Sequence, residues 1–496
     1  MNNCENVKDY LNKTKQKNYL HLDFPISKGE QKKLIDNLDK EIFHHRYLPF
    51  IRTNIVFLKY SGITKEVKPK IRKLTLPSHH DAVMYQYFGY QLSRRYEKRV
   101  KNTVIDNAAV AYRLDKHVSN ITVAKEIVDF VTDHNECWII KGDFKSFFDM
   151  LDHKVLIKSL LDLLGKDYDI SYKKMIRSLT KYKYITRDTL ENQLRNLKIN
   201  KPYRRASGKA YTKNLRQLGH FIKNRGIRLS SPNRVGIPQG TAVSAVLANI
   251  YMYNFDRWLS ANVKKYNGIY RRYSDDFIVV VPMSIAKQKY ITSLKDKIID
   301  YSKKKIHLKI ERHKTQLLFY SKKDREILKF TGNAYNKSQL VYLGFAFDGI
   351  SVSLRSKSAY KFTYRSKRAI NRYISVMNNR KRYYNSEGPS RLTMKYNSKG
   401  KREYRWLNNT EKFRKRKFYV KAVAMKTTKV HSYHKNIVKR FLAIKNVIPR
   451  SSMLSYANKA QKLFQYRSHG KYRVVIRRQV QRQIIRNQRI VGITLH

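Results

Sequence analysis

Two adjacent aspartates, Asp275 and Asp276, stand between a basic, tyrosine-flanked segment, IYRRYS, and a run of bulky β-forming residues, FIVVV. Two carboxylates this close repel each other, and one of them takes up a proton unless a cation lies between them. The pair therefore indicates a metal site at the tip of a hairpin. A solvated hairpin or a helix cap would also accept two such residues, so the pair alone does not distinguish a metal site from a structural turn.

A third carboxylate would complete a site for two metal ions. Asp143 is the best candidate because it follows a buried strand predicted at Trp138–Ile140 and precedes a polar turn. Two hard cations about 3.5–4 Å apart, held by oxygen ligands, suit in-line phosphoryl transfer. One ion activates the attacking hydroxyl and the other stabilises the leaving oxygen. The expected cofactor is Mg²⁺, as two ions, with Mn²⁺ as the alternative.

Hydrophobic patterning predicts the elements that position these residues. FIVVV is β-branched and too short for a helix, so it is expected to form one arm of a hairpin whose other arm carries Arg271 and Arg272. A helix is predicted to start after Asp152 and to end near Gly165. Three further expectations are a helix after Pro77 capped by Asp81, a loop at 236–240 that leads into a helix, and a hairpin over 341–354 that turns at Asp348–Gly349.

The charge of the chain points to a polyanionic partner. Among 496 residues there are 106 lysines and arginines against 36 acids, a formal net charge of +70, with 42% hydrophobic residues to build a core. Nucleic acid is the most common polyanion that neutralises such a body, so nucleotidyl transfer is the natural reaction class. There is no long apolar segment and no apolar leader, and the two cysteines form no metal-binding pattern. We therefore expect a soluble cytoplasmic protein with no membrane association.

The basic residues are concentrated near the C-terminus. Residues 351–496 contain 39 lysines and arginines but only three acids, and aromatic residues are interleaved with them, as in KRYY (381–384) and KREYRW (401–406). Basic side chains can follow phosphates while rings stack on unpaired bases, so this region is predicted to grip nucleic acid. Apolar segments such as 437–448 favour folded helices over a disordered basic tail.

Six motifs occur in an order that resembles the fingers and palm of reverse transcriptases. They are RKLTLP (72–77), GDFKSFFD (142–149), GIPQGTAVSAVLANIY (236–251), YSDD (273–276), HKT (313–315) and YLGF (342–345). The resemblance covers roughly residues 65–350. It implies that Asp143, Asp275 and Asp276 are the catalytic, metal-binding carboxylates and that the backbone carbonyl of Phe144 completes the metal coordination.

The resemblance also implies residues that bind the incoming deoxynucleoside triphosphate. Arg72 would clamp the triphosphate, with Lys70 as a helper, and Gln239 would contact the nucleotide. Phe148 would block a ribose 2′-hydroxyl, and Lys314 would protonate the leaving pyrophosphate. Phe148 also fits a core residue, and Arg72 and Lys314 also fit surface residues. The segment Tyr342–Phe345 would be the primer grip.

The implied fold is α+β, a right-hand polymerase. Its expected parts are a helical N-terminal extension (1–65), fingers and palm (66–350) with a basic insertion (166–234), and a basic, mainly helical thumb or C-terminal nucleic-acid-binding region (351–496). With no Cys/His cluster after the palm and only three acids beyond residue 350, an HNH or RNase H domain is not expected.

This pattern is most similar to the bacterial "unknown group" reverse transcriptases associated with antiphage defence. The resemblance implies a non-coding RNA template or scaffold, dNTPs, a DNA product and, as a hypothesis, priming from a tyrosine hydroxyl. A homo-oligomer assembled on RNA in the bacterial cytoplasm is a further expectation. An RNA-dependent RNA polymerase and a catalytically idle, maturase-like RNA-binding protein remain as alternatives.

Overall fold

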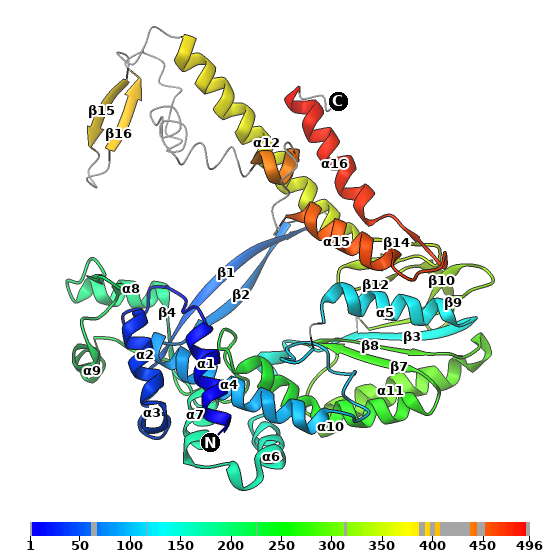
Figure 1. Cartoon of the computed structure of the whole chain (residues 1–496), viewed down its shortest axis with the longest axis horizontal. Coiled ribbons are helices and arrows are strands. Elements are labelled where there is room, and N and C mark those ends of the chain that lie inside the picture. Colours follow the sequence, from blue (N-terminus) through cyan, green and yellow to red (C-terminus); the bar gives the residue numbers. More distant parts are fainter. Residues whose placement is uncertain are drawn as a thin grey trace. The chain divides into compact units, whose positions relative to one another are not determined.

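The computed structural model describes residues 2–60, 67–116, 118–224, 226–311, 315–385, 392–396, 402–406, 437–443 and 452–492. The chain combines helices with mainly antiparallel sheets, in agreement with the mixed α+β class (Figure 1). The chain divides into two compact units, one formed by residues 1–118 and 136–319 and the other by residues 119–135 and 320–496. Among the described residues, no helix is long and apolar enough to cross a membrane.

The first unit contains most of the predicted site. Its first half comprises α1 Asn2–Lys13, α2 Lys28–Asp36, α3 Leu38–His44, β1 Phe50–Tyr60, β2 Val67–Leu76, α4 His79–Val100, β3 Glu136–Asp143, the 3₁₀ turn η1 Phe147–Met150, α6 His153–Leu164 and η2 Gly165–Asp167. Its second half comprises α7 Ile170–Thr180, β4 Tyr184–Thr186, α8 Arg187–Asn196, β5 Tyr203–Arg205, β6 Gly208–Ala210, α9 Leu215–Lys223, α10 Ser244–Lys264, β7 Ile269–Tyr273, β8 Asp276–Val281, η3 Ile285–Lys287, α11 Gln288–Lys305 and β9, which begins at Gln316 and ends at Ser321.

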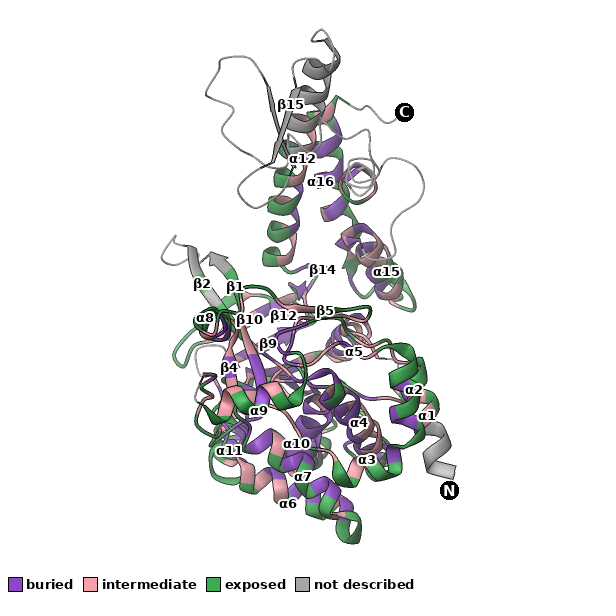
Figure 2. Ribbon diagram, turned by 90° about the vertical axis from the view of Figure 1, so that its left-hand side faces the viewer, coloured by how far each residue is buried: buried purple, intermediate pink, exposed green. Residues whose placement is uncertain are grey.

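A central sheet organises this unit. Strand β3 lies between β8 and β9, and β7 lies beyond β8. Residues Phe277–Val281 of β8 are all buried, so the strand is covered on both faces, and the helices α10 and α11 lie over one of them (Figures 1 and 2). The buried β-branched run that the sequence predicted is therefore an interior strand of the sheet, as expected for a segment with no polar alternation.

A second, smaller sheet joins β1 to β2 and β4. The antiparallel pair β1–β2 forms a long ribbon, and β4 pairs with β1 in parallel (Figure 1). The prediction that residues 1–65 are helical is therefore right for α1, α2 and α3 but wrong for Phe50–Tyr60. That segment is rich in β-branched and aromatic residues, and it gains backbone partners from β2, a strand that lies outside residues 1–65.

Helix ends test the capping predictions directly. Helix α6 starts after Asp152, whose carboxylate accepts the amide hydrogens of Lys154 and Val155, and it ends at Gly165 in a positive-φ conformation, as predicted. The prediction for α4 is wrong, since Ser78 is its cap and accepts the amide hydrogen of Asp81. The Asp81 carboxylate instead accepts from His45 and from the Leu48 amide, contacts that depend on a distant segment.

The second unit carries the C-terminal elements. It comprises α5 Asn120–Asp133, β10 Glu326–Phe330, β11 Tyr335–Ser338, β12 Leu340–Tyr342, β13 Phe345–Phe347, β14 Ser351–Leu354, α12 Ser356–Asn385, β15 Leu392–Tyr396, β16 Arg402–Trp406, the π-helical turn η6 Val438–Leu442, α15 Met453–Gln465, β17 Arg473–Val474 and α16 Ile476–Val491. The predicted turn at Asp348–Gly349 joins β13 to β14, and a second turn at Leu343–Gly344 joins β12 to β13.

Candidate active site

The three predicted aspartates lie at one end of the paired strands β3 and β8. Asp143 is the last residue of β3 and Asp276 is the first residue of β8, and the two are direct partners in the antiparallel register. Such partners project from the same face of a sheet with Cβ atoms about 4.5–5.5 Å apart. Asp275 occupies the two-residue loop between β7 and β8. The fold thus brings together carboxylates from distant parts of the sequence.

Backbone contacts fix the aspartates in place. The Phe144 amide donates to the Asp275 carbonyl at 3.1 Å, and the Glu311 amide donates to the Asp143 carbonyl at 2.8 Å. The Phe144 ring is buried and lies 5.5 Å from the ring of Phe277, the residue after Asp276. Hydrogen bonds therefore connect the backbone of Asp275 to Phe144 and the backbone of Asp143 to Glu311, and the ring next to Asp276 packs on Phe144.

The electrostatics of the site favour a bound cation. Burial raises the pKa of Asp275 above its usual value, and the negative charge of Asp143 raises it further, although hydrogen bonds from the Asp275 amide and the Ser274 hydroxyl lower it. The two carboxylates are close enough for a hydrogen bond between them. A divalent cation between them would remove the repulsion that raises the pKa.

The donor set fits Mg²⁺, because carboxylate oxygens are the ligands that this hard cation prefers. The carboxylates of Asp143 and Asp275 interact with each other. Asp276, the first residue of β8, is the cross-strand partner of Asp143 on β3. Within the described part of the chain, however, no group of three or more His, Cys, Asp or Glu side chains is arranged to hold an ion. The roles of Asp276 and of the Phe144 carbonyl as ligands stay predictions.

The loop that carries Gln239 is attached to two other predicted parts of the site. The Ile237 amide donates to the Phe148 carbonyl at 2.9 Å, which ties the loop to η1. The Thr75 amide of β2 donates to the Gln239 carbonyl at 2.8 Å, which ties the same loop to the strand of Arg72. The Phe148 side chain is half-buried, so it is neither a fully buried core residue nor a surface one. Phe148, Gln239 and β2 therefore meet around a single loop.

The predicted cations are less well determined. Arg72 is exposed on β2, with its guanidinium 5.8 Å from the centre of the Phe57 ring on β1. The strand β2 includes Lys70, opposite Phe57 in the register, but the Lys70 side chain lies outside the described parts. Lys314 also lies outside the described residues. Their roles in binding the triphosphate and protonating pyrophosphate stay predictions.

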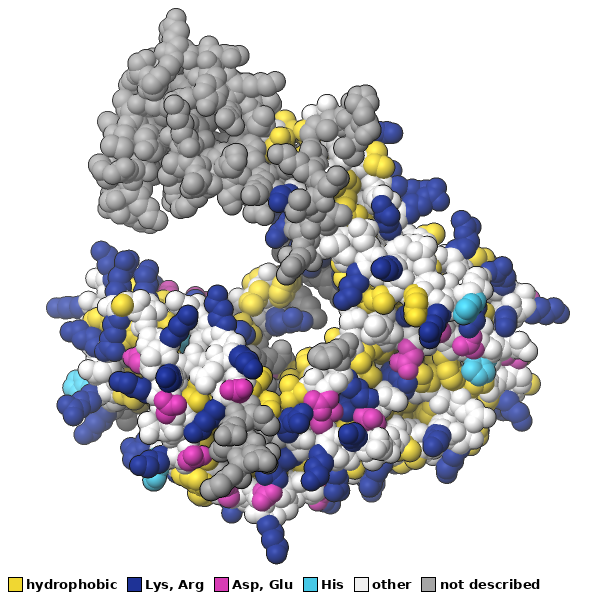
Figure 3. Space-filling model, viewed as in Figure 1, with side chains coloured by type: hydrophobic (Ala, Val, Ile, Leu, Met, Phe, Trp, Pro, Cys, Tyr) yellow, Lys and Arg dark blue, Asp and Glu magenta, His cyan; other side chains and the backbone are white. Residues whose placement is uncertain are grey.

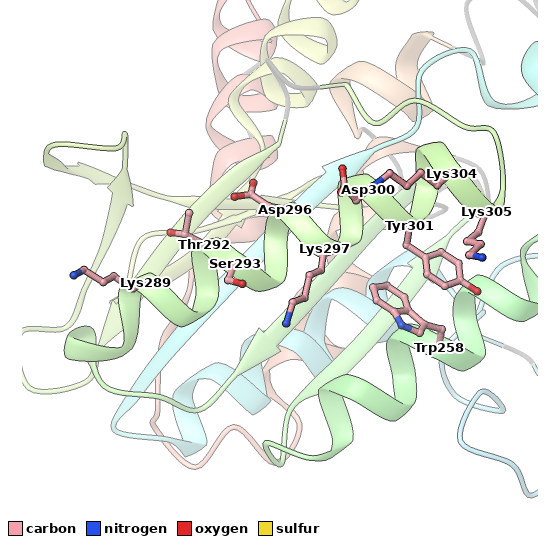
Figure 4. Close-up of a pocket in the computed structure, with 10 residues that line it drawn as sticks. All are labelled: Trp258, Lys289, Thr292, Ser293, Asp296, Lys297, Asp300, Tyr301, Lys304 and Lys305. Atoms are coloured by element: carbon pink, nitrogen blue, oxygen red, sulfur yellow. Dashed lines mark hydrogen bonds and ion pairs between the residues drawn. The ribbon is translucent and has the colours of Figure 1, made fainter.

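A hollow of about 610 Å³ lies over α10 and α11 and contains none of the predicted site residues (Figure 4). Trp258 and Tyr301 stack on each other there, with ring centres 4.2 Å apart. Its lining mixes lysines with the acids Asp296 and Asp300. The two acids therefore compensate part of the positive charge of the lining.

A second hollow, of about 470 Å³, has a different character. It lies in the second unit and is lined by Gln461, Gln465, Arg473, Val474, Val475, Arg477, Arg478 and Gln481. Within the described part of the chain, no acidic side chain pairs with its three arginines. Uncompensated guanidinium groups on an exposed surface suit phosphate oxygens. Lysine and arginine side chains are also scattered over the face seen in Figure 3, where they outnumber the acids.

Comparison with known proteins decides the family. A family profile described as "Reverse transcriptase (RNA-dependent DNA polymerase)" matches residues 89–347, more than half of the chain. The chain belongs to the reverse transcriptase family. The match confirms the family that the ordered motifs predicted. The matched residues of this reverse transcriptase include Asp143, Phe148, Gln239, Asp275 and Asp276, whereas Arg72 precedes them.

Solved structures of telomerases are among the similar folds. Apo telomerase from Candida tropicalis, truncated from its C-terminal domain, is 14% identical with a TM-score of 0.38, and the match covers 66% of this chain and 61% of that one. Telomerase from Candida albicans in complex with a TWJ fragment of telomeric RNA is 13% identical with a TM-score of 0.35, covering 69% of this chain and 55% of that one. The chain thus matches less than two thirds of the length of either telomerase. No curated protein matches the sequence.

The sequence analysis missed the surroundings of the loop that carries Asp275. It placed Arg272 in a basic segment, whereas the structure buries its side chain completely against Asp256 of α10. It also missed Tyr112, whose hydroxyl donates to the Ser274 hydroxyl at 3.2 Å. One signal was present, because Asp256 follows Phe255 within a largely apolar helix, where a lone acid needs a buried partner.

Proposed function

We propose that this chain is an RNA-directed DNA polymerase that adds deoxynucleotides to a 3′ hydroxyl by two-metal nucleotidyl transfer. The observation that carries the proposal is the close approach of Asp143 and Asp275 at the ends of paired strands, in a chain of the reverse transcriptase family. Asp143 and Asp275 would hold the ions, with Asp276 and the Phe144 carbonyl as further ligands. Bound there, Mg²⁺ would supply Lewis-acid activation of the attacking hydroxyl and of the leaving oxygen.

Other residues of the chain would orient the nucleotide. The exposed guanidinium of Arg72 would donate to phosphate oxygens in a fork, with Lys70 beside it on β2 and Lys314 as the proton donor to pyrophosphate. The hydrogen bond between Thr75 and Gln239 supports joint action of β2 and the Gln239 loop on one substrate. Phe148, held to the same loop through Ile237, would occupy the space of a ribose 2′-hydroxyl and select deoxynucleotides.

The basic surface of the second unit would bind the nucleic acid. Helix α16 exposes a row of arginines and contains no acid in its first turn, and the hollow at its start adds Arg473. Helix α12 exposes Tyr360 and Tyr364 one turn apart, beside lysines and arginines. Guanidinium groups would contact phosphates while the tyrosine rings stack on bases. In this proposal the first unit forms the fingers and palm, and α12, α15 and α16 belong to the thumb.

The narrower biological role is also a proposal. The basic insertion at 166–234 and the basic region 351–496, without an HNH or RNase H pattern, support a member of the bacterial defence-associated group, which would work in the cytoplasm with a non-coding RNA. The large positive charge supports assembly of any homo-oligomer on that RNA, because uncompensated copies repel each other. The exposed tyrosines Tyr360, Tyr364 and Tyr466 are the described C-terminal candidates for a priming hydroxyl. DNA made without added primer that runs free of protein, without protease treatment, would exclude protein priming.

The test begins with the protein purified together with its bound nucleic acid. Mg²⁺ and each dNTP are supplied separately, and the bound RNA and any new DNA are sequenced. DNA complementary to the bound RNA is the expected product. Incorporation of ribonucleotides alone would instead identify an RNA-dependent RNA polymerase. No incorporation by the wild-type protein, together with full biological activity of an Asp275→Ala/Asp276→Ala variant, would identify an idle RNA-binding protein.

A further inference from the structure

The loop that presents the catalytic aspartates has a conformation that needs support. Ser274 and Asp275 form the two-residue connection between β7 and β8, and Ser274 has a φ of +63°. The first central residue of such a turn is usually glycine, because a side chain in this region clashes with its own backbone. A serine in this position therefore requires contacts that hold the strained turn.

Arg272 supplies such a contact from inside the protein. Its Nη1 donates to the Ser274 carbonyl at 3.0 Å, so the guanidinium is attached to the turn two residues further along the chain. Its Nε and Nη2 donate to the two carboxylate oxygens of Asp256 at 2.9 and 2.7 Å, and Nη2 also donates to Asn249 at 3.2 Å. Three nitrogens of one planar group therefore connect the turn to α10.

The other end of this network is equally fixed. Asp256 is fully buried and also accepts the hydroxyl hydrogen of Tyr270 at 2.7 Å. Asn249 donates to the Ala111 carbonyl at 2.9 Å, and the Arg272 amide donates to the Ala108 carbonyl at 2.7 Å. Helix α10 thus holds the guanidinium through Asp256 and Asn249, and the segment around residue 110 anchors Asn249 and the Arg272 backbone.

Stability alone does not account for such a pair. Removing two charges from water costs so much that replacing a buried ion pair by apolar side chains of similar size is often neutral or stabilising. A lysine could pair with Asp256, but a single ammonium group cannot span a carboxylate, an amide and a carbonyl in the way the guanidinium fork does. The geometry, rather than the charge, is what an arginine adds at this position.

We infer that Arg272, held by Asp256 and Asn249, is a positioning residue that fixes the Ser274 turn and thereby sets the location of Asp275 and Asp276. The inference rests on the proposed polymerase function and adds a residue that touches neither substrate nor metal. Because a misplacement of about 1 Å at a reacting centre can cost about 100-fold in rate, loss of this support lowers kcat more than it affects nucleotide binding.

The test separates positioning from stability. The parent protein is the Tyr270→Phe variant. It lacks the hydroxyl group that donates to Asp256 but keeps the hydrogen bond from Arg272 to the Ser274 carbonyl. Adding Arg272→Met and Asp256→Leu to that parent removes the pair without leaving a buried charge. We expect this variant to keep the Tm of the parent within a few degrees, while its kcat for dNTP addition falls about 100-fold at an unchanged dNTP KM. A kcat within threefold of the parent in a folded protein overturns the inference.

Hydrogen exchange gives a readout that does not depend on activity. The amides of the peptide spanning residues 270–280 should exchange about tenfold faster in the substituted variant than in Tyr270→Phe. If the apolar variant does not fold, the Arg272→Lys variant tests the inference instead, since it keeps a positive charge beside Asp256. A wild-type rate and unchanged exchange in Arg272→Lys overturn the inference. If the wild-type protein adds no dNTP, the proposed function fails, and the exchange data alone still test the positioning role.

Discussion

The most specific consequence of the site geometry concerns Gly240, the residue after Gln239. Its φ is +135°, and a Cβ built on it would lie 2.5 Å from the Thr75 carbonyl oxygen, whereas ordinary contact begins at 3.4 Å. In Gly240→Ala the carbonyl must therefore move away by about 0.9 Å, the difference between those two distances. Strained backbone and overpacking each cost about 1–3 kcal/mol, so we expect a local cost of about 2–6 kcal/mol.

This movement separates the Gln239 loop from β2, the strand that carries Arg72. If both elements hold the same triphosphate, the dNTP KM should rise, and kcat/KM should fall by about 10- to 100-fold. The assay is single-nucleotide addition on an RNA template across a range of dNTP concentrations. Gly332→Ala is the matched control, because Gly332 has a φ of +102° but nothing within 4 Å of its built Cβ.

The control should lose only the stability that backbone strain costs, with unchanged dNTP kinetics. If Gly240→Ala has a kcat/KM within twofold of the control in a folded protein, the proposed cooperation of β2 with the Gln239 loop is wrong. Melting curves of both variants show whether a loss of activity reflects unfolding instead.

The remaining predictions concern three other parts of the protein. Burial and the charge of Asp143 raise the pKa of Asp275, so its contribution to stability is present below its unfolded pKa and is lost as the pH rises through its folded pKa. Asp275→Asn should therefore raise the metal-free Tm at pH 7, measured in EDTA, while abolishing nucleotide addition, and an unchanged or lower Tm contradicts the repulsion inferred here. Phe148→Ala should reduce discrimination against ribonucleotides by about 10- to 200-fold, measured as the ratio of kcat/KM for dNTP and NTP, and an unchanged ratio assigns Phe148 to packing alone. Replacing Arg473, Arg477 and Arg478 by Gln should reduce the slope of log K against log salt for RNA binding by about 2–3, and an unchanged slope shows that the hollow does not contact phosphates.

Local signals predicted local structure well. The carboxylate of Asp152 and the glycine at 165 mark the ends of α6 because capping depends on a few neighbouring residues. The FIVVV run was predicted to be a strand because it is β-branched and too short for a helix, and it lies in β8. The cap of α4 was misassigned because Ser78 and Asp81 are both suitable residues, and only the packing of His45 determines where the Asp81 carboxylate points.

Non-local contacts were beyond the reach of a single sequence. Phe50–Tyr60 forms a strand because it pairs with β2. The sequence does not show that these two segments are partners. Arg272 was assigned only to one arm of the predicted hairpin, since its buried partner Asp256 lies on a different element. The aspartates were found because their order and spacing identify a family, whereas the support beneath them depends on three-dimensional packing.

The central claim is RNA-directed DNA synthesis by the carboxylates of Asp143 and Asp275. The most direct measurement is extension of a labelled DNA primer on a defined RNA template with Mg²⁺, comparing the wild-type protein with Asp143→Asn and Asp275→Asn, and dNTPs with NTPs. Template-directed addition of dNTPs by the wild-type protein, lost in both variants while their melting curves remain cooperative, is the predicted result. Addition that persists in either variant, or that uses NTPs in preference to dNTPs, would contradict the account.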